Sequence, residues 1–243
     1  MSKTHDTVAG KGSPLGKYQD VMVGSRGLGK LLYFEWCMLL SPIPGALGIV
    51  LRKLFWPRLF GACGGGCMFA SGIILRRPGR IFLGHAVVIS ERCVLDGRGT
   101  GERAIELGDN VMLSNDITLS CKEGSITIGA NTGINTQAIV QSTHGCPVVI
   151  GEDCILGQRS LVIAGGSYNI DDLEKLIREQ GIRNDGGIEL AGNVWLGANV
   201  SVLGGVKMGR GSIAGTGAVV TRSIPENAVC LGIPAKVVKR RGE

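Results

Sequence analysis

Apolar side chains recur at every sixth position of this chain from Cys63 to Val220. The register falls into groups of three hexads, whose first positions are Cys63, Phe69, Leu75; Leu83, Ile89, Leu95; Leu107, Leu113, Leu119; Ile128, Ile134, Val140; Ile150, Leu156, Val162; Leu190, Leu196, Val202; and Met208, Ala214, Val220. One such group cannot bury its own apolar positions, so stacked groups must cover one another. The pattern therefore predicts a solenoid of about seven coils, each made of three short strands.

Extra residues interrupt the hexads at one recurring place, the junction after the third hexad of a group. Relative to an uninterrupted six-residue step, these junctions carry two, six, three, four and twenty-two additional residues, and the last junction, from Val202 to Met208, carries none. Insertions placed at random would fall at every corner of a coil. Their placement predicts that a single edge of a three-sided prism carries the loops.

The longest insertion, at residues 167–189, has a helical pattern of its own. Asn169 can cap a helix and Gly181 can end one. The apolar residues between them share one helical face, and they are Ile170, Leu173, Leu176 and Ile177. We expect a short helix on an extended loop.

The most hydrophobic part of the chain precedes the repeats, at residues 30–62. Its longest uncharged run, Trp36 to Leu51, is shorter than the ~20 residues of a membrane-spanning helix and contains prolines. Aromatic and basic residues then alternate, as in segments that lie in a membrane interface. The same pattern suits a helical cap that packs on the end of the solenoid, and the two interpretations are compatible.

The net charge of +6 is concentrated at the two ends of the chain. Residues 1–60 carry +5 and the last fourteen residues carry +3, which leaves −2 for the middle. This distribution does not suggest a basic groove for nucleic acid, and we expect no nucleic-acid partner.

We divide the chain into four parts on these patterns. They are a polar tail at 1–29 that we expect to be flexible, the hydrophobic basic segment at 30–62, the solenoid at 63–229 with its inserted loop at 167–189, and a basic C-terminal segment at 230–243.

The eight cysteines show no CxxC spacing, and several occupy small-residue positions of the repeat, such as Cys67, Cys93 and Cys154. This usage indicates reduced packing residues in a reducing compartment. The first thirty residues are polar and glycine-rich, unlike a signal peptide. We expect a cytoplasmic protein with a peripheral membrane contact through residues 30–60.

Three motifs mark the end of the repeats, "VWLGA", "GTGAVVT" and "GIPAKVV". With them the chain resembles the hexapeptide-repeat acyltransferases over residues 63–241, in particular the galactoside and maltose O-acetyltransferase-like branch and its polysaccharide-modifying relatives. The resemblance implies an all-β fold, a left-handed parallel β-helix, in a homotrimer. It also implies transfer of an acyl group, usually acetyl, from coenzyme A to a hydroxyl or amine of a sugar or lipid-linked glycan.

Acyl transfer to a hydroxyl needs a base, and histidine is the usual choice because its pKa lies near neutrality. The resemblance places that histidine at the mouth of the long insertion. At that place this chain has other residues, namely Ser167, Tyr168 and Asn169. Neither a serine nor a tyrosine at its ordinary pKa can be assumed to replace an imidazole.

The chain contains only three histidines. His5 lies in the polar tail, and His85 lies several coils before the closing motifs. His144 belongs to the coil before the insertion, on the same edge, and stacked strands are only about 4.8 Å apart. We predict that His144 is the general base, although the fifth position of a hexad packs inward elsewhere and His144 could instead be a buried corner residue.

The resemblance also marks positions for the two substrates. Asn135 and Trp195 match acceptor contacts, and Tyr168 is added because it stands at the mouth of the insertion. Acetyl-CoA, or another acyl-CoA, is expected along a groove formed by Ala198, Thr216, Thr221, Arg222, Lys236 and Lys239. Structural explanations are also open for three of these positions: Asn135 as a turn residue, Trp195 as a packed ring, and Lys236 to Arg241 as a solvated basic tail.

Two other functions remain open. A metal-dependent hydratase on the same β-helix needs three ligand histidines, whereas the repeats contain only His85 and His144, so we expect no metal. A scaffold or binding protein that keeps the donor groove but lacks the base is the stronger alternative, because of Ser167 and Tyr168.

Overall fold

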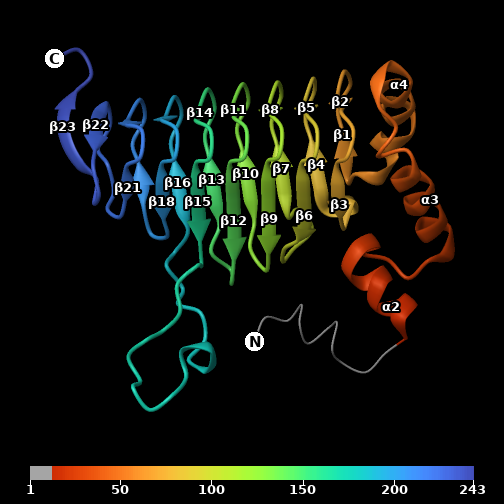
Figure 1. Cartoon of the computed structure of the whole chain (residues 1–243), viewed down its shortest axis with the longest axis horizontal. Coiled ribbons are helices and arrows are strands. Elements are labelled where there is room, and N and C mark those ends of the chain that lie inside the picture. Colours follow the sequence, from red (N-terminus) through yellow and green to blue (C-terminus); the bar gives the residue numbers. More distant parts are fainter. Residues whose placement is uncertain (1–12) are drawn as a thin grey trace.

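The computed structural model describes residues 13–243. His5 and the first part of the predicted tail lie outside these residues. A three-sided prism of stacked coils makes up most of the molecule (Figure 1). The predicted all-β fold, a left-handed parallel β-helix of about seven coils, is confirmed.

The prism has three faces, which we call sheets A, B and C. Sheet A contains β1 (Ala62–Cys63), β4 (Ile81–Leu83), β7 (Ile105–Leu107), β10 (Ile126–Ile128), β13 (Val148–Ile150), β16 (Ile188–Leu190) and β19 (Lys207–Met208). Sheet B contains β2 (Met68–Phe69), β5 (Val88–Ile89), β8 (Met112–Leu113), β11 (Gly133–Ile134), β14 (Ile155–Leu156), β17 (Trp195–Leu196), β20 (Ile213–Ala214), β22 (Ala228–Leu231) and the antiparallel β23 (Lys236–Arg240). Sheet C contains β3 (Ile74–Arg76), β6 (Val94–Arg98), β9 (Thr118–Lys122), β12 (Ile139–Thr143), β15 (Leu161–Ala164), β18 (Ser201–Leu203) and β21 (Val219–Val220).

The first positions of the hexads stack directly on one another. Leu83 pairs with Leu107, for example, and Ile128 pairs with Ile150 in neighbouring strands of sheet A. All of these first positions are buried except Cys63 in the first coil, which is partly exposed. The hexad period therefore builds one continuous apolar core along the prism axis.

Two edges of the prism differ in how the chain turns. At the edge where sheet C leads into sheet A, here called the loop edge, all the predicted insertions are found, which confirms their placement. At the edge where sheet B leads into sheet C, here called the smooth edge, the coils approach closely. A Cβ on Gly157 would lie 2.5 Å from the carbonyl carbon of Gly197 in the next coil, so only glycine fits there.

The long insertion forms an arm that projects from the loop edge after β15 (Figure 1). Its stem is a short two-stranded ladder, in which the Arg183 amide donates to the Ser167 carbonyl at 2.7 Å. The expected short helix is reduced to one 3-10 turn, η4 (Ile177–Glu179). The Gln180 side chain explains this, because its amide donates to the carbonyls of Asp172 and Lys175, which a longer helix would need for its own hydrogen bonds.

Helices close the first coil of the prism (Figure 1). They and the remaining short helical turns are α2 (Pro14–Tyr18), η1 (Gln19–Val23), α3 (Leu28–Leu39), α4 (Gly45–Phe55), η2 (Trp56–Leu59) and η3 (Pro78–Arg80). Trp56 is completely buried, its ring centroid lies 5.6 Å from that of Phe69 in β2, and its indole N–H donates to the Cys37 carbonyl. We call α3, α4 and η2 the cap.

The cap helices are short. Among residues 13–243, no helix combines the length and the apolar content that crossing a membrane requires. The described part of the 1–29 segment continues the helical end of the molecule, because the Met22 carbonyl accepts a hydrogen bond from the Arg77 amide, at the start of the second coil.

Candidate functional site

His144 stands on the loop edge, directly after β12. The chain leaves the hexad register there, because His144 and Gly145 both adopt the left-handed conformation, with φ of 52° and 73°. Ser142 and Cys146 are buried on either side, while the His144 side chain is exposed. The imidazole therefore does not pack inside the coil, and among residues 13–243 it has no hydrogen-bond partner.

The neighbours of His144 hold it at the root of the arm. The Thr143 hydroxyl donates to the carbonyl of Gly165, where the arm begins, at 2.6 Å. The Cys146 thiol lies 3.4 Å from Oδ1 of Asn184, near the end of the arm. The turn that carries the imidazole is thus tied to both ends of the arm.

Asp185 joins the two ends of the arm, a role that the hexad pattern did not reveal. Its carboxylate accepts hydrogen bonds from the amides of Gly165 (2.7 Å) and Gly187 (2.9 Å). The sequence "NDGG" at residues 184–187 is a turn signal that could have drawn attention to it. Because Asp185 fixes both ends, the arm leaves the prism in a defined direction.

Cys146 contributes the thiol of this turn. The side chain is completely buried, and burial raises the pKa of its thiol. A thiol that stays protonated inside the coil is a poor nucleophile. The chemistry at this corner therefore depends on the imidazole.

His85 occupies a different edge, between sheets A and B. Its Nδ1 accepts a hydrogen bond from the Gly65 amide of the preceding coil at 3.1 Å. One ring nitrogen thus has a structural role in stacking the coils, away from the arm.

Four of the predicted substrate and donor residues lie along the smooth edge. Asn135, Ala198 and Thr216 follow β11, β17 and β20, and the Ala198 carbonyl accepts the Gly217 amide of the next coil. Lys236 begins β23 opposite Leu231, whose side chain lies against Gly215, so it continues this row at the C-terminal end. The Asn135 side-chain amide donates to the Leu156 carbonyl at 3.0 Å, which also gives this residue a structural role.

The other predicted residues are placed elsewhere. Thr221 and Arg222 are exposed on the loop edge after β21, and Tyr168 is exposed on the stem of the arm. Trp195 projects from the outer surface of sheet B, about half exposed, and Lys239 is exposed on β23. Among residues 13–243, no three His, Cys, Asp or Glu side chains form a group that could hold a metal ion.

The smooth edge and the loop edge lie on opposite sides of sheet C. A five-residue strand such as β12 spans roughly 15 Å. A donor bound along the smooth edge of one chain is therefore too far from His144 of the same chain for direct proton transfer, which requires hydrogen-bond distance.

Comparisons with known proteins agree with the architecture. No family model matches the chain. Over 164 residues it is 32% identical to a protein of Mycobacterium tuberculosis described as a probable acetyltransferase, with 67% of this chain and 51% of the relative covered. It is also 28% identical over 167 residues to a protein of Escherichia coli described as a lipopolysaccharide biosynthesis O-acetyl transferase, covering 66% of this chain and 82% of that one.

Among solved structures, a maltose O-acetyltransferase from Clostridium difficile shares the fold. It is 20% identical with a TM-score of 0.50, and the match covers 100% of this chain and 99% of that one. The chain spans about half the length of the mycobacterial relative. The resemblance to hexapeptide-repeat acetyltransferases, recognised from the closing motifs, is thereby confirmed.

Proposed function

Because the chain resembles the hexapeptide-repeat acetyltransferases and shares their β-helix, we propose that it transfers an acetyl group from coenzyme A to a hydroxyl or amine of a sugar or glycan acceptor. One observation carries the proposal. An exposed imidazole without a hydrogen-bond partner among the described residues stands at the root of the arm, on the edge of a β-helix. His144 is thus available to a substrate, in contrast to His85.

The proposed reaction uses His144 first as a base and then as an acid. The imidazole takes the proton of the acceptor hydroxyl while its oxygen attacks the thioester carbonyl carbon. A C–O bond forms and the C–S bond breaks, and the imidazolium returns the proton to the departing sulfur. Backbone N–H groups at a close-packed, glycine-rich edge can stabilise the oxyanion of the tetrahedral intermediate.

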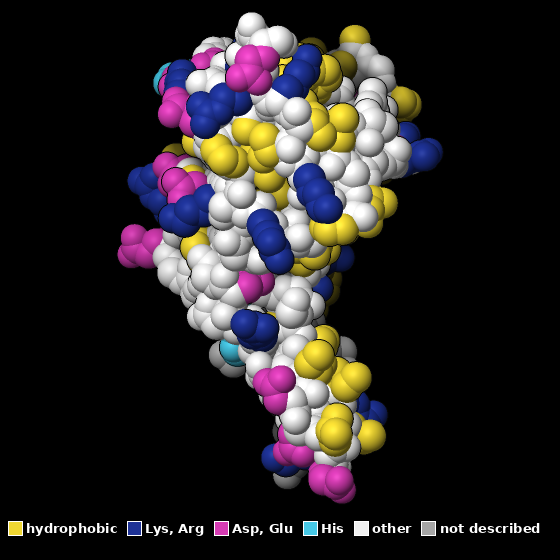
Figure 2. All heavy atoms as spheres, turned by 90° about the vertical axis from the view of Figure 1, so that its left-hand side faces the viewer, with side chains coloured by type: hydrophobic (Ala, Val, Ile, Leu, Met, Phe, Trp, Pro, Cys, Tyr) yellow, Lys and Arg dark blue, Asp and Glu magenta, His cyan; other side chains and the backbone are white. Residues whose placement is uncertain are grey.

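We infer that the complete site lies between two chains of a homotrimer. Ala198, Thr216 and Lys236 form a row of predicted donor contacts on the smooth edge, here called the donor row. Within one chain this row is separated from His144 on the loop edge, so a second chain must bring the two together. The arm tip offers a contact surface, because it exposes four aliphatic side chains (Figure 2), namely Ile170, Leu173, Leu176 and Ile177. Sheet B adds an outward apolar row made of Met68, Met112, Ile155 and Trp195.

The trimer is expected to depend on the arm tip. Leu173 is 92% exposed, so Leu173→Asp leaves the fold of one chain intact but places a charge in the contact. Light scattering in mild detergent should give the mass of three chains for the wild-type protein and a smaller mass for this variant. Lys175→Ala, at the same tip, is the control and should remain trimeric. A wild-type monomer would contradict the shared site.

We further propose a cytoplasmic location. All eight cysteines are free, and seven are buried, which suits a reducing compartment.

We propose an acceptor that is linked to lipid or present as a free glycan. The exposed aromatic ring of Trp195 and the Tyr168 ring on the arm stem are available to stack on a sugar.

Turnover of acetyl-CoA tests the proposed function. The purified protein is incubated with acetyl-CoA and a panel of sugars, nucleotide sugars and lipid-linked glycans, and the free thiol of coenzyme A is measured. Acceptor-dependent thiol release, with acetylated product seen by mass spectrometry, is the expected result. Binding of acetyl-CoA without turnover on any acceptor would favour the scaffold alternative, and absence of binding would contradict the donor groove.

A further inference from the structure

The outer surface of the cap carries two apolar stripes. On α3 the exposed side chains are Leu28, Leu32, Trp36 and Leu39, and on α4 they are Leu47, Val50 and Leu54. Within each helix these residues are three or four positions apart, so they lie along one face. The opposite faces are buried against the first coil, for example through Phe34 and Arg52.

The stripes belong to a helix pair that is held rigidly. The Tyr33 hydroxyl donates to the Phe55 carbonyl at 2.6 Å, which ties α3 to the end of α4. The rings of Trp36 and Phe55 meet edge to face with centroids 5.9 Å apart. The apolar face is therefore already formed in the folded protein.

A cavity of about 560 Å³ lies beside this surface, between the cap and η3. Its apolar wall includes Phe34, Phe60 and Pro78. Its charged residues are all basic, and they are Lys30, Arg58, Arg77 and Arg80. No carboxylate lines the cavity among the described residues.

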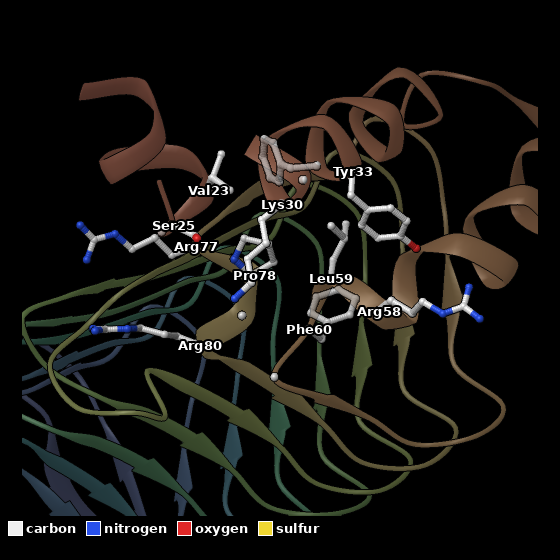
Figure 3. A pocket seen from close by; sticks show the side chains of 15 residues that line it. Val23, Ser25, Lys30, Tyr33, Arg58, Leu59, Phe60, Arg77, Pro78 and Arg80 are labelled. Atoms are coloured by element: carbon white, nitrogen blue, oxygen red, sulfur yellow. The ribbon is translucent and has the colours of Figure 1, made fainter. Parts of the chain in front are cut away.

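Three of these cations lie on one side of the cavity, and the guanidinium groups of Arg77 and Arg80 extend away from its aromatic wall. Figure 3 shows Arg77 and Arg80 extending in the same direction, with Lys30 between them and the aromatic rings, while Arg58 extends the opposite way. Arg77 Nε donates to the Asp20 carbonyl and Arg80 Nη1 donates to the Gly99 carbonyl, both within 2.7 Å. Each guanidinium is thus anchored through one nitrogen and keeps others for a ligand.

The positive charge of this cavity is poorly compensated. Two carboxylates act electrostatically on Arg77, those of Asp20 and Asp96. Both already form ion pairs, with Arg26 and Arg98 respectively. Burial, and then the charges of Arg80 and Arg98, lower the pKa of the Arg77 guanidinium. Among residues 13–243, Lys30, Arg77 and Arg80 form no ion pair with a carboxylate. An anion in the cavity would relieve this repulsion.

We propose that the cap is a docking surface for an anionic phospholipid bilayer, with the cavity taking the phosphate of one lipid. The stripes enter the interface, with the Trp36 ring near the headgroups, as aromatic residues do at membrane boundaries. Lys30 lines the cavity from α3, the helix whose other side carries the first stripe, so the cavity adjoins the cap. Exposed Lys53 and Arg58 add positive charge around them. A phospholipid matches both features because its phosphate is attached to acyl chains.

Vesicle binding by the full-length protein tests this surface. Wild type should bind vesicles of phosphatidylglycerol in phosphatidylcholine at least about tenfold more tightly than vesicles of phosphatidylcholine alone, and added salt should reduce the difference. The cavity variant Lys30→Gln/Arg80→Gln should lose about 25-fold of the affinity for anionic vesicles, since each cation near such a surface contributes about fivefold. The stripe variant Leu32→Ser/Val50→Ser should lose at least about tenfold on both vesicle types.

Matched changes elsewhere serve as controls. Val149→Ser and Lys207→Gln replace an exposed apolar residue and an exposed lysine on sheet A, and neither should alter vesicle binding. Thermal unfolding of the stripe variant and of both controls should match wild type because their side chains are exposed, whereas Arg80→Gln removes the hydrogen bond to the Gly99 carbonyl and should cause a small loss of stability. Brominated lipid should quench the Trp36 emission, and Trp36→Phe should abolish that quenching.

Three results would overturn the proposal. The first is vesicle binding that neither variant changes. The second is stabilisation by soluble glycerol 3-phosphate, lost in the cavity variant, without any vesicle binding, because the cavity would then be a site for a small free anion. The third is self-association in the absence of lipid that Leu32→Ser/Val50→Ser removes, because a second copy of the chain would then cover the stripes.

Discussion

His144→Ala is expected to lower kcat for acetyl transfer by about 10²- to 10⁴-fold, which is the usual contribution of a positioned general base or acid. Binding of acetyl-CoA should be unchanged, because the donor row lies on the smooth edge and does not include this residue. Thermal unfolding should also be unchanged, since the imidazole is exposed and has no partner among residues 13–243. Steady-state kinetics with the best acceptor from the panel, together with isothermal titration of acetyl-CoA, measure these effects.

The matched control is His85→Ala, which removes the other histidine of the prism. It deletes the acceptor of the hydrogen bond from the Gly65 amide, so a modest loss of stability is expected with normal turnover. If His144→Ala kept wild-type kcat, the base would have to be another group. If both variants lost turnover equally, the effect would be structural and would not support a base at residue 144.

The architecture was predictable because burial in a stacked solenoid is strictly periodic. Each hexad has to place its first side chain in the same core, so a six-residue spacing is visible in one sequence without any alignment. The loop edge was predictable for the same reason. The spacing within a coil is kept when extra residues enter where the chain passes from one coil to the next.

The orientation of His144 could not be predicted from the same rule. By counting from Val140 it occupies the fifth position of its hexad, which packs inward elsewhere. In the structure β12 continues to Thr143, and His144 and Gly145 turn in the left-handed conformation. Cys146 then takes the buried position. Periodicity fails at the loop edge because the insertion after the third hexad changes the direction of the chain.

Contacts between distant residues were also hidden from the sequence. Asp185 binds Gly165 across the whole arm, and the Gln180 side chain takes the carbonyls that a helix from Asn169 would have used. The hydrophobic segment at 30–62 could be interpreted as a cap or as an interfacial segment. In the structure its helices bury one face against the first coil, as a cap does, and expose an apolar face, which we propose to be interfacial.

Arg52→Ala is expected to lower the free energy of unfolding by about 3–5 kcal/mol, the combined scale of a cavity left by a large buried side chain and of buried carbonyls that lose a donor. Arg52 is completely buried, and its guanidinium donates to the carbonyls of Leu40, Ser41 and Ile43 between the cap helices and to Phe69 in β2. Alanine would leave these carbonyls without that donor and create a cavity at the junction of cap and prism. For a chain of this size, the midpoint of thermal unfolding should fall by roughly 10 °C.

Lys53→Ala is the matched control for Arg52→Ala, because it removes the neighbouring cation of the same helix, which is exposed. Its effect on unfolding should stay within about 0.5 kcal/mol. Since terminal caps keep solenoids soluble, Arg52→Ala should also increase proteolysis within residues 30–60 and promote aggregation through the uncovered first coil. Equal midpoints for the two variants, measured by circular dichroism, would show that the cap is held by the packing of Trp56 and Phe69 and does not depend on the buried guanidinium.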